Sequence, residues 1–257
     1  LPIWSGYSPV CANEWNPVHC RKPQIKCGDC SARLLVPVTD QVMHDHMAGK
    51  HTVGIYPILP DDTCWFLVAD FDDADWWQDA LAFVQTCRHY EVPVVLEISR
   101  SGVGAHVWLF FSGPVPARTA RLLGAALISR TCDRFRQLKL SSYDRLFPNQ
   151  DTLPKGGLGN LIALPLQKVP RAAGHSVFVD DRFEAFLDQW SFLSSIRRLD
   201  PAEMDAVLGR VGAGRHPLDI ADVSDIDETA PWQSRKRNVC KLEGPLPESV
   251  GIVVAKL

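Results

Sequence analysis

The stretch Phe66-Leu-Val-Ala-Asp-Phe-Asp-Asp73 decides the fold, because here an apolar strand ends on a pair of acidic side chains. Successive side chains of a strand point to opposite faces, so Asp70 and Asp72 share one face. Two like charges that lie this close favour a bound divalent cation. The stretch predicts either a divalent metal site or, more simply, a strand end that runs into a solvated turn.

A short segment rich in serine and glycine joins the next two predicted strands. It reads Glu97-Ile-Ser-Arg-Ser-Gly-Val-Gly-Ala-His106 and continues into an apolar strand. Glycines let backbone N–H groups approach an anion closely, and Arg100 and His106 add positive charge. This combination suits a triphosphate, although the segment alone would also fit an ordinary hairpin with a structural histidine.

The composition indicates a globular protein. The chain has 257 residues, of which 46% are hydrophobic and 22% charged, and its formal net charge is -3. These values exclude a disordered polyelectrolyte and a strongly basic nucleic-acid binder. No apolar run approaches the ~18 residues that a membrane-spanning helix needs. An acidic metal centre that offsets basic surfaces elsewhere would still allow nucleic-acid chemistry. The first residues lack both a signal peptide and an initiator Met, so we expect a piece of a longer protein.

Hydrophobic periodicity and turn residues predict a mixture of helices and strands. Helices are expected over residues 39–48, 75–90, 116–135, 184–198 and 201–211, and strands over 53–57, 64–70, 92–99, 105–111, 161–164 and 176–179. Their irregular order favours an α+β fold over a doubly wound one. The stretch after residue 214 has the composition of a linker or tail, with the start of a strand near residue 250. We expect the tryptophans of these elements in the core, namely Trp65, Trp76, Trp77 and Trp108.

Half of the eight cysteines lie within the first 30 residues, at Cys11, Cys20, Cys27 and Cys30. The sequence Cys27-Gly-Asp-Cys30 places two thiolates on a tight knuckle where both can reach one ion, and the other two can complete a tetrahedral zinc site. His19 is an alternative to Cys20 as a ligand. Two disulfides or free thiols are the other interpretations, and the lack of a secretory signal favours zinc.

Taken together, the motifs resemble the archaeo-eukaryotic primase superfamily. They are most similar to the primase domain of the TOTE conflict systems, which are bacterial defence modules that join a primase to helicase segments. The similarity covers roughly residues 6 to 200 and is carried by Cys11-Ala-Asn-Glu-Trp15, Lys26-Cys-Gly-Asp-Cys30, Val68-Ala-Asp-Phe-Asp72, Ser99-Arg-Ser-Gly102, Gly104-Ala-His-Val-Trp108, Ser142-Tyr-Asp-Arg-Leu-Phe-Pro-Asn-Gln-Asp151 and Gly159-Asn-Leu-Ile-Ala-Leu-Pro-Leu-Gln167.

The resemblance implies an α+β catalytic core with an RRM-like mixed or antiparallel sheet flanked by helices. It divides the chain into a cysteine-rich zinc module over residues 1–34, a primase-polymerase domain over 35–211, and a linker or tail over 212–257 that leads toward a further region such as a helicase. It also implies a bacterial, cytoplasmic protein without a membrane partner.

The implied activity is template-directed nucleotidyl transfer with two Mg2+ or Mn2+ ions. Asp70 and Asp72 would hold the ions with a third acid, for which the family pattern points to Asp144 and, as the alternative, Asp151. His106 would contact the triphosphate. Further phosphate contacts are expected from Arg100, Ser101, Gly104, Lys155 and Lys168. The Ser-x-His form of many superfamily members reads Gly104-Ala-His106 here, so a serine hydroxyl would have to come from Ser101 or Ser99.

The implied partners are a single-stranded DNA template with its primer, an NTP or dNTP substrate, and helicase or nuclease segments in the same chain or operon. Two basic sets are candidates for template contacts. One lies on and after a predicted helix and comprises Arg118, Arg121, Arg130, Arg134, Arg136 and Lys139; the other lies near the cysteines and comprises Arg21, Lys22, Lys26 and Arg33. Competing hypotheses are a metal-dependent nuclease and a nucleic-acid-binding module without catalysis. A relaxase-like histidine pair at His44 and His46 is disfavoured, because these side chains diverge on a helix.

Overall fold

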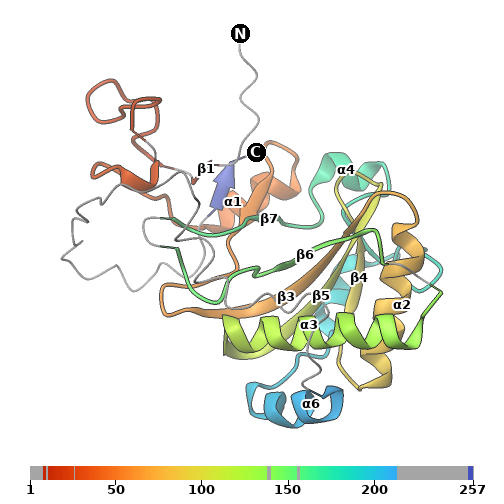
Figure 1. The fold of residues 1–257 in the computed structure, drawn as a ribbon. Helices are drawn as coiled ribbons and strands as arrows, with labels where there is room; N and C mark the ends of the chain where they lie inside the picture. Colours follow the sequence, from red (N-terminus) through yellow and green to blue (C-terminus); the bar gives the residue numbers. More distant parts are fainter. Residues whose placement is uncertain are drawn as a thin grey trace.

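The protein is described from a computed structural model, which covers residues 8–9, 11–25, 27–137, 140–154, 157–212 and 254–256. Strands and helices follow each other irregularly (Figure 1), as the α+β prediction requires. The strands are β1 (Ser8–Pro9), β2 (Val53–Ile55), β3 (Thr63–Asp72), β4 (Val95–Ile98), β5 (Gly104–Pro116), β6 (Tyr143–Phe147), β7 (Ile162–Ala163), β8 (Val177–Val179) and β9 (Val254–Lys256). The helices are η1 (Cys27–Asp29), α1 (Asp40–Met47), α2 (Trp76–His89), α3 (Ala117–Arg134), α4 (Lys168–Ala172), α5 (Gln189–Ser195), η2 (Pro201–Glu203) and α6 (Met204–Val211).

A five-stranded antiparallel sheet forms the centre of the molecule. Its strand order is β6-β3-β5-β4-β8, so β3 lies between β5 and β6. In the β3–β5 register, Asp70 lies opposite His106 and Asp72 lies opposite Gly104. The sheet thereby places the acidic stretch directly beside the Ser/Gly connection, which is the juxtaposition that the two motifs require.

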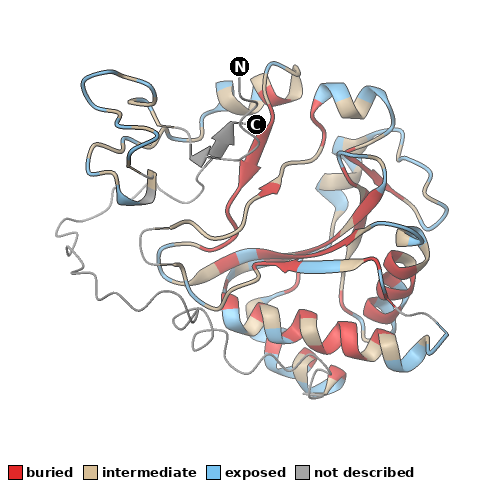
Figure 2. Ribbon diagram, turned by 45° about the horizontal axis from the view of Figure 1, so that its top comes forward, coloured by how far each residue is buried: buried red, intermediate tan, exposed pale blue. Residues whose placement is uncertain are grey.

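The two faces of this sheet have different surroundings. Helices α2 and α3 cover one face, where Phe71 of β3 lies 5.7 Å from the ring of Phe83 in α2 and Leu67 approaches Gly124 of α3. Burying a phenylalanine such as Phe71, which is fully buried, contributes roughly 1.5–3 kcal/mol. Because side chains alternate along a strand, Asp70 and Asp72 project from the opposite face. Figure 2 shows the buried residues concentrated in these central strands and in α2 and α3.

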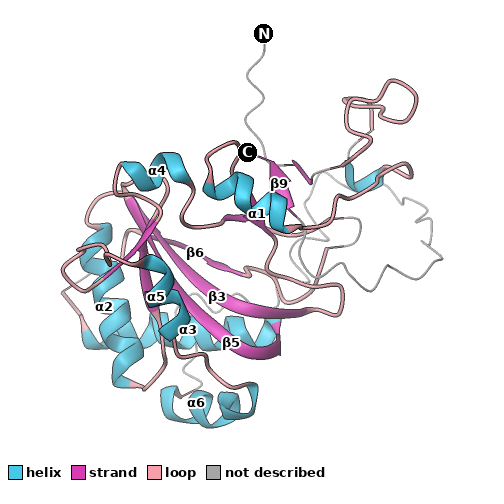
Figure 3. Ribbon diagram, turned by 180° about the vertical axis from the view of Figure 1, so that it is seen from behind, coloured by secondary structure: helices cyan, strands magenta, loops and turns pink. Residues whose placement is uncertain are grey.

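A second, smaller antiparallel sheet has the order β1-β9-β2-β7. Helices α1 and α4 lie on this side of the molecule, away from α3 and α6 (Figures 1 and 3). His46 of α1 joins the helix to this sheet, since its Nδ1 accepts a hydrogen bond from the Val53 N–H at 3.0 Å and its Nε2 donates to Pro165 O at 2.9 Å. His46 is fully buried, whereas His44 is exposed, so the two side chains diverge as predicted.

Several predicted elements need correction. The helix expected over residues 184–198 is only Gln189–Ser195, because the Asp188 side chain caps it by accepting from Trp190 N and Ser191 N. Neither β6 nor α4 was predicted. The expectation that all four tryptophans are buried is wrong, since Trp65 and Trp77 are 46% and 48% exposed. Residues 213–253 of the predicted tail lie outside the described residues, and β9 pairs with β1 and β2.

None of the helices that the structure describes is long and apolar enough to cross a membrane.

Candidate active site

Three aspartates converge on the face of the large sheet that lies opposite helices α2 and α3. Carboxylate oxygens of Asp70, Asp72 and Asp144 all lie within 4.8 Å of one another, and among the described residues no other group of three His, Cys, Asp or Glu side chains converges in this way. Of the two candidates for the third acid, the structure brings Asp144 to the pair. Asp151 instead forms an ion pair with Arg121 at 3.2 Å.

An irregularity in the strand pairing turns Asp144 toward the other two acids. In the register between β3 and β6, Asp70 lies opposite Arg145, but Phe71 lies opposite Tyr143, so Asp144 is an extra residue in β6. A bulge of this kind re-aims a side chain. In a regular pairing Asp144 would face Phe71 and the helices; the bulge lets it share the face of Asp70.

A buried hydrogen-bond network fixes this bulge. Asp79 of α2 is buried, and its Oδ2 accepts from the Ser142 backbone N–H at 3.2 Å and from the Ser142 hydroxyl at 2.7 Å. Ser142 O in turn accepts from the Asp72 N–H at 2.7 Å. Helix α2 therefore holds the start of β6 against the end of β3, and this contact sets the position of Asp144.

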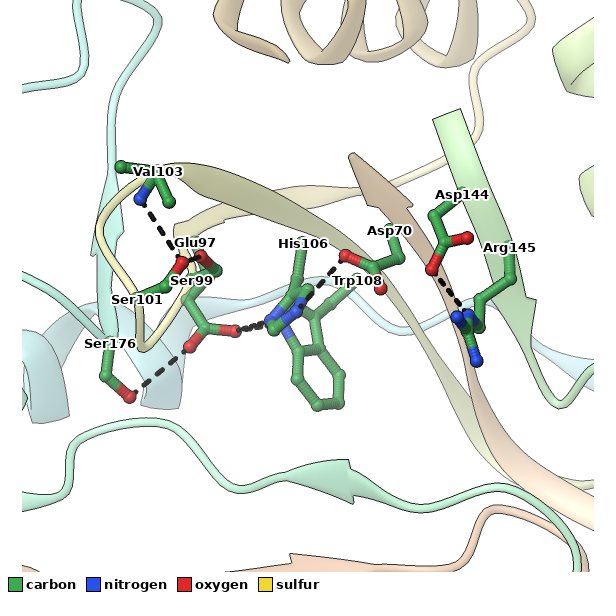
Figure 4. Close-up of polar contacts among 10 residues, drawn as sticks. All are labelled: Asp70, Glu97, Ser99, Ser101, Val103, His106, Trp108, Asp144, Arg145 and Ser176. Atoms are coloured by element: carbon green, nitrogen blue, oxygen red, sulfur yellow. Dashed lines mark hydrogen bonds and ion pairs between the residues drawn. The ribbon is translucent and has the colours of Figure 1, made fainter. Parts of the chain in front are cut away.

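His106 lies between two carboxylates in neighbouring strands (Figure 4). Its Nδ1 is 3.0 Å from Glu97 Oε2, which also accepts from Trp108 Nε1 at 2.6 Å, and its Nε2 is 3.5 Å from Asp70 Oδ1. Because a carboxylate only accepts, the Glu97 contact requires a proton on Nδ1. Glu97 thus orients the imidazole so that Nε2 faces the acid cluster.

The electrostatics of these acidic side chains and of His106 favour a bound cation at the aspartates. Burial raises the pKa of Asp70 to about 6, and Asp72 and Asp144 add to the increase, while His106 opposes it. Burial also raises the pKa of Asp72. For His106, burial disfavours the charged form, but Glu97 and the aspartates outweigh burial and raise its pKa.

Asp70 Oδ1 shows why the cluster suits a metal ion. This oxygen is buried and forms no hydrogen bond among the described residues, and its one ion-pair contact there is the 3.5 Å approach of His106 Nε2. An unsatisfied buried carboxylate oxygen is costly unless a cation binds it. Three clustered carboxylates with one such oxygen have the donor chemistry that Mg2+ and Mn2+ prefer, so the residues present fit the implied metal.

Comparison with known proteins agrees with this geometry. A family model described as the archaeo-eukaryotic primase domain of the TOTE conflict system matches residues 4–207. The chain belongs to this family. No curated protein matches it. Membership supports a nucleotidyltransferase-type enzyme of the primase kind, and an α+β fold of antiparallel sheets flanked by helices is consistent with such a domain.

In this primase domain, the Ser/Gly hairpin between β4 and β5 closes tightly on the acid cluster. The hydroxyl groups of Ser99 and Ser101 share a hydrogen bond of 2.9 Å, and Gly102 turns the chain with a φ of +78°. A side chain at Gly104 would have its Cβ 2.1 Å from Asp72 Oδ1. Glycine at this position is therefore required for β5 to pass so close to the acid.

The basic candidates are not gathered at the cluster. Arg100 is exposed on the hairpin, and Lys168 is exposed on α4, where it packs against Gly49. Neither forms an ion pair with Asp70 or Asp72 among the described residues. Lys155 lies outside them. Their expected contacts with phosphate stay predictions.

The four N-terminal cysteines face a common small cavity. Cys11, Cys20, Cys27 and Cys30 line it together with His19, and no disulfide joins the described cysteines. No three of these sulfur atoms lie within 4.8 Å of one another in the described structure. The donor set fits zinc in its chemistry, whereas the converged tetrahedral site is not seen.

The basic residues of the two proposed template-binding sets are partly engaged within the protein. Lys22 forms an ion pair with Glu14 at 2.7 Å and lies 5.5 Å from the centre of the Trp15 ring. On α3, Arg121 pairs with Asp151, and Arg130 donates to Val211 O at 2.6 Å. Lys26 and Lys139 lie outside the described residues.

Three residues of the site were missed in the sequence, and one is Arg145, whose Nε donates to Asp144 Oδ2 at 2.6 Å. Glu97 is a charged residue inside an apolar strand, and Asp79 is the acid in the first turn of α2 on a face with Phe83. A carboxylate within a buried element must find donors, and this rule could have identified Glu97 as a functional candidate. Nothing in the sequence near Asp79 indicates its contact with Ser142, which is 63 residues away.

Proposed function

We propose that this primase domain is a DNA primase-polymerase that catalyses template-directed nucleotidyl transfer. The observation that carries the proposal is the convergence of Asp70, Asp72 and Asp144 beside a histidine that is held in a raised-pKa environment. An acid cluster alone would serve many metal enzymes. A cation-binding cluster next to a positive side chain on a glycine-rich hairpin suits a substrate that carries a triphosphate.

Asp70, Asp72 and Asp144 would hold two Mg2+ or Mn2+ ions. When bound, the ions would supply charge neutralisation at the triphosphate and favour deprotonation of the attacking hydroxyl group. The chain places these carboxylates in advance, because β3 and β6 are braced by Ser142 and Asp79. Preorganised ligands avoid the cost of moving charged groups during the reaction.

His106 would contact the triphosphate through Nε2–H, with Nδ1–H held by Glu97. We assign the supporting phosphate contacts to the hairpin residues Arg100, Ser101 and Gly104 and to Lys155 and Lys168. The hairpin contributes because its serines supply hydroxyl groups and because Gly104 lets its backbone pass close to the acid cluster.

The remaining assignments are part of the same proposal. The cysteine module over residues 1–34 would bind one structural zinc, and residues 35–211 would form the catalytic domain. The partners would be single-stranded DNA with a primer and an NTP or dNTP, with helicase or nuclease segments in the same chain or operon. A bacterial cytoplasmic location would follow from a role in a conflict system.

A primer-extension assay tests this function. The protein is incubated with Mn2+, a labelled nucleotide and a primed single-stranded template, and we expect extension that is lost in the Asp70→Ala/Asp72→Ala variant. The matched control is Asp181→Asn, because Asp181 is an acid that pairs with Arg88 outside the site. This variant should extend primers as the wild type does.

Three outcomes would contradict the proposal. If the double variant still extended primers, Asp70 and Asp72 would not be the metal ligands that the reaction needs. Cleavage of DNA without any nucleotide would favour a metal-dependent nuclease instead. Metal-independent DNA binding without nucleotide incorporation would indicate a module that binds nucleic acid without catalysis.

A further inference from the structure

Arg145 places a second basic side chain at the acid cluster, opposite His106. Among the described residues, two basic side chains form ion pairs with members of this cluster. His106 Nε2 lies 3.5 Å from Asp70 Oδ1, and Arg145 Nε donates to Asp144 Oδ2 at 2.6 Å. Because β3 lies between β5 and β6, His106 and Arg145 flank the acids of β3 from opposite sides (Figure 4). The cluster therefore has a basic group on each side.

The side chain of Arg145 can be reached by a molecule bound at the cluster. Arg145 lies directly opposite Asp70 in the register between β3 and β6. Residues that lie opposite each other on neighbouring strands share a face of the sheet, so Arg145 lies on the side of the acids and not on the side of α2 and α3. Strand β6 is at the edge of the sheet, and the Arg145 side chain is 48% exposed.

The guanidinium group of Arg145 has donors to spare. Its Nε–H is used by Asp144, whereas Nη1 and Nη2 form no hydrogen bond among the described residues. A guanidinium carries five N–H donors, and four of them are on the two Nη atoms. Their planar arrangement matches the oxygen atoms of a phosphate group. Arg145 can therefore bind a phosphate while it stays paired with Asp144.

The same positive charge opposes the entry of a metal ion on its own. Arg145 already offsets part of the negative charge of the cluster, since it works against the rise in the pKa of Asp70 and of Asp72. A divalent ion would bind beside this fixed charge and share Asp144 with it, and like charges repel. A phosphate chain supplies negative charge to both cations. Each of the two ligands, metal and phosphate, should thus favour the binding of the other.

We propose that Arg145 couples metal binding to nucleotide binding. In the free protein it is the counter-ion of Asp144, and in the loaded protein its Nη donors bind the phosphate chain of the nucleotide. This role rests on the proposed function, because it requires a nucleotide triphosphate at the metal centre. It goes further by giving Arg145 a function and by making the metal ion and the nucleotide bind cooperatively.

Two calorimetric titrations test this coupling. The first adds Mn2+ alone, and the second adds inorganic tripolyphosphate in the presence of saturating Mn2+. Arg145→Gln keeps an N–H donor for Asp144 but removes the charge. We expect this variant to bind Mn2+ alone roughly 2- to 10-fold more tightly than the wild type. It should bind tripolyphosphate roughly tenfold or more weakly, the loss expected for a charge-assisted hydrogen bond.

The opposite signs of these two changes distinguish coupling from a structural role. If Arg145 only held Asp144 in place, its loss would weaken both Mn2+ and tripolyphosphate binding. Salt gives a second readout, because about 1 M NaCl shortens the screening length to about 3 Å. The gain in Mn2+ affinity of Arg145→Gln should shrink as NaCl is raised to this concentration.

Two further variants complete the design. Arg197→Gln is the matched control, because Arg197 is a 62% exposed arginine that pairs with Glu203 at 3.5 Å outside the site. It should leave both affinities unchanged. Arg145→Lys keeps the charge without the planar set of donors. It should bind Mn2+ alone nearly as the wild type does and lose less tripolyphosphate affinity than Arg145→Gln.

The outcomes separate the coupling from the proposed function. Suppose that the wild type binds Mn2+ and tripolyphosphate. If Arg145→Gln then binds Mn2+ alone no more tightly than the wild type, or binds tripolyphosphate equally well, the coupling is overturned and the proposed function stands. If the wild type binds neither Mn2+ nor tripolyphosphate, the proposed function fails and the coupling fails with it.

Discussion

Asp70 couples metal binding to pH. Its pKa is about 6, compared with 3.8 for an ordinary aspartate, chiefly because the side chain is buried. The folded protein therefore binds this proton more tightly than the unfolded chain, so without metal the fold loses stability as the pH rises from 3.8 to about 6 and gains none back above that. A metal ion must displace the same proton. We expect the apparent Mn2+ affinity to fall up to about tenfold per pH unit below pH 6. Calorimetric Mn2+ titrations between pH 5 and 8 measure this slope.

Asp70→Asn is the matched variant for this prediction. Without the buried charge, the metal-free variant at pH 8 should be more stable than the wild type by about 1–3 kcal/mol, while Mn2+ binding is lost. Denaturant unfolding with and without Mn2+ separates the two effects. A pH-independent Mn2+ affinity in the wild type, or a metal-free variant that is less stable than the wild type, would contradict the role of Asp70.

Glu97 acts on the reaction through His106. Replacing it with glutamine removes the charge that raises the pKa of His106, while burial continues to lower that pKa. Glu97→Gln should therefore weaken nucleotide binding roughly tenfold or more at pH 8, the loss expected for a charge-assisted hydrogen bond. At pH 6 the loss should be smaller than at pH 8, because a larger fraction of His106 is protonated at the lower pH. Nucleotide titrations at both pH values measure this difference.

The control for Glu97 is Glu203→Gln, since Glu203 is an exposed acid that pairs with Arg197 at 3.5 Å. It should leave binding unchanged at both pH values. A merely structural role for Glu97 would weaken binding equally at pH 6 and pH 8, and such a result would exclude the positioning role.

Among the elements, the β4–β5 hairpin sets the distance between the anion-binding segment and the acids. A Cβ at Gly104 would lie 2.1 Å from Asp72 Oδ1 and 2.7 Å from Phe71 O, and the backbone atom cannot move away cheaply. Gly104→Ala should reduce Mn2+ affinity at least tenfold and lower the free energy of unfolding by about 1–3 kcal/mol. Calorimetry and denaturant unfolding measure the two changes.

Gly113→Ala in the same strand is the control. Its Cβ would meet only the Pro201 ring at 3.3 Å, so metal binding should be unaffected. If Gly104→Ala bound Mn2+ as the wild type does, Gly104 would not determine the position of Asp72.

The elements also show which parts of the site could be predicted. Strands β3 and β5 are long and apolar, so their existence and the shared face of Asp70 and Asp72 follow from periodicity. Strand β6 is short and carries Asp144 and Arg145, so its pattern is not that of a buried strand. The bulge at Asp144 depends on contacts with β3 and α2, which a local pattern does not contain. Only the family resemblance pointed to Asp144.

The whole molecule combines a packed catalytic region with an N-terminal part that has no core of its own. Apart from η1, the described residues of 11–34 form turns and an isolated bridge, and none whose burial is described is buried. Residues 53–211 by contrast supply nearly all of the core. The cysteines of the N-terminal part were evident in the sequence, because metal-ligand spacing is local. How their sulfur atoms are arranged depends on the path of the chain between them.

A structural zinc would provide the cross-link that this part lacks, since structural zinc in small modules supplies about 10–16 kcal/mol of apparent binding free energy. We expect one zinc per purified chain by elemental analysis. The zinc is removed with a chelator, and Mn2+ is then added back for the acid cluster. After this treatment we expect protease to cut residues 11–34 first, while the catalytic region stays resistant. Cys27→Ser/Cys30→Ser should behave in this way without chelator. Cys132→Ser on α3 should keep both the zinc and the resistance, because Cys132 lies outside the module. Zinc that is absent from the wild type, or retained by the double variant, would show that the cysteines serve another purpose.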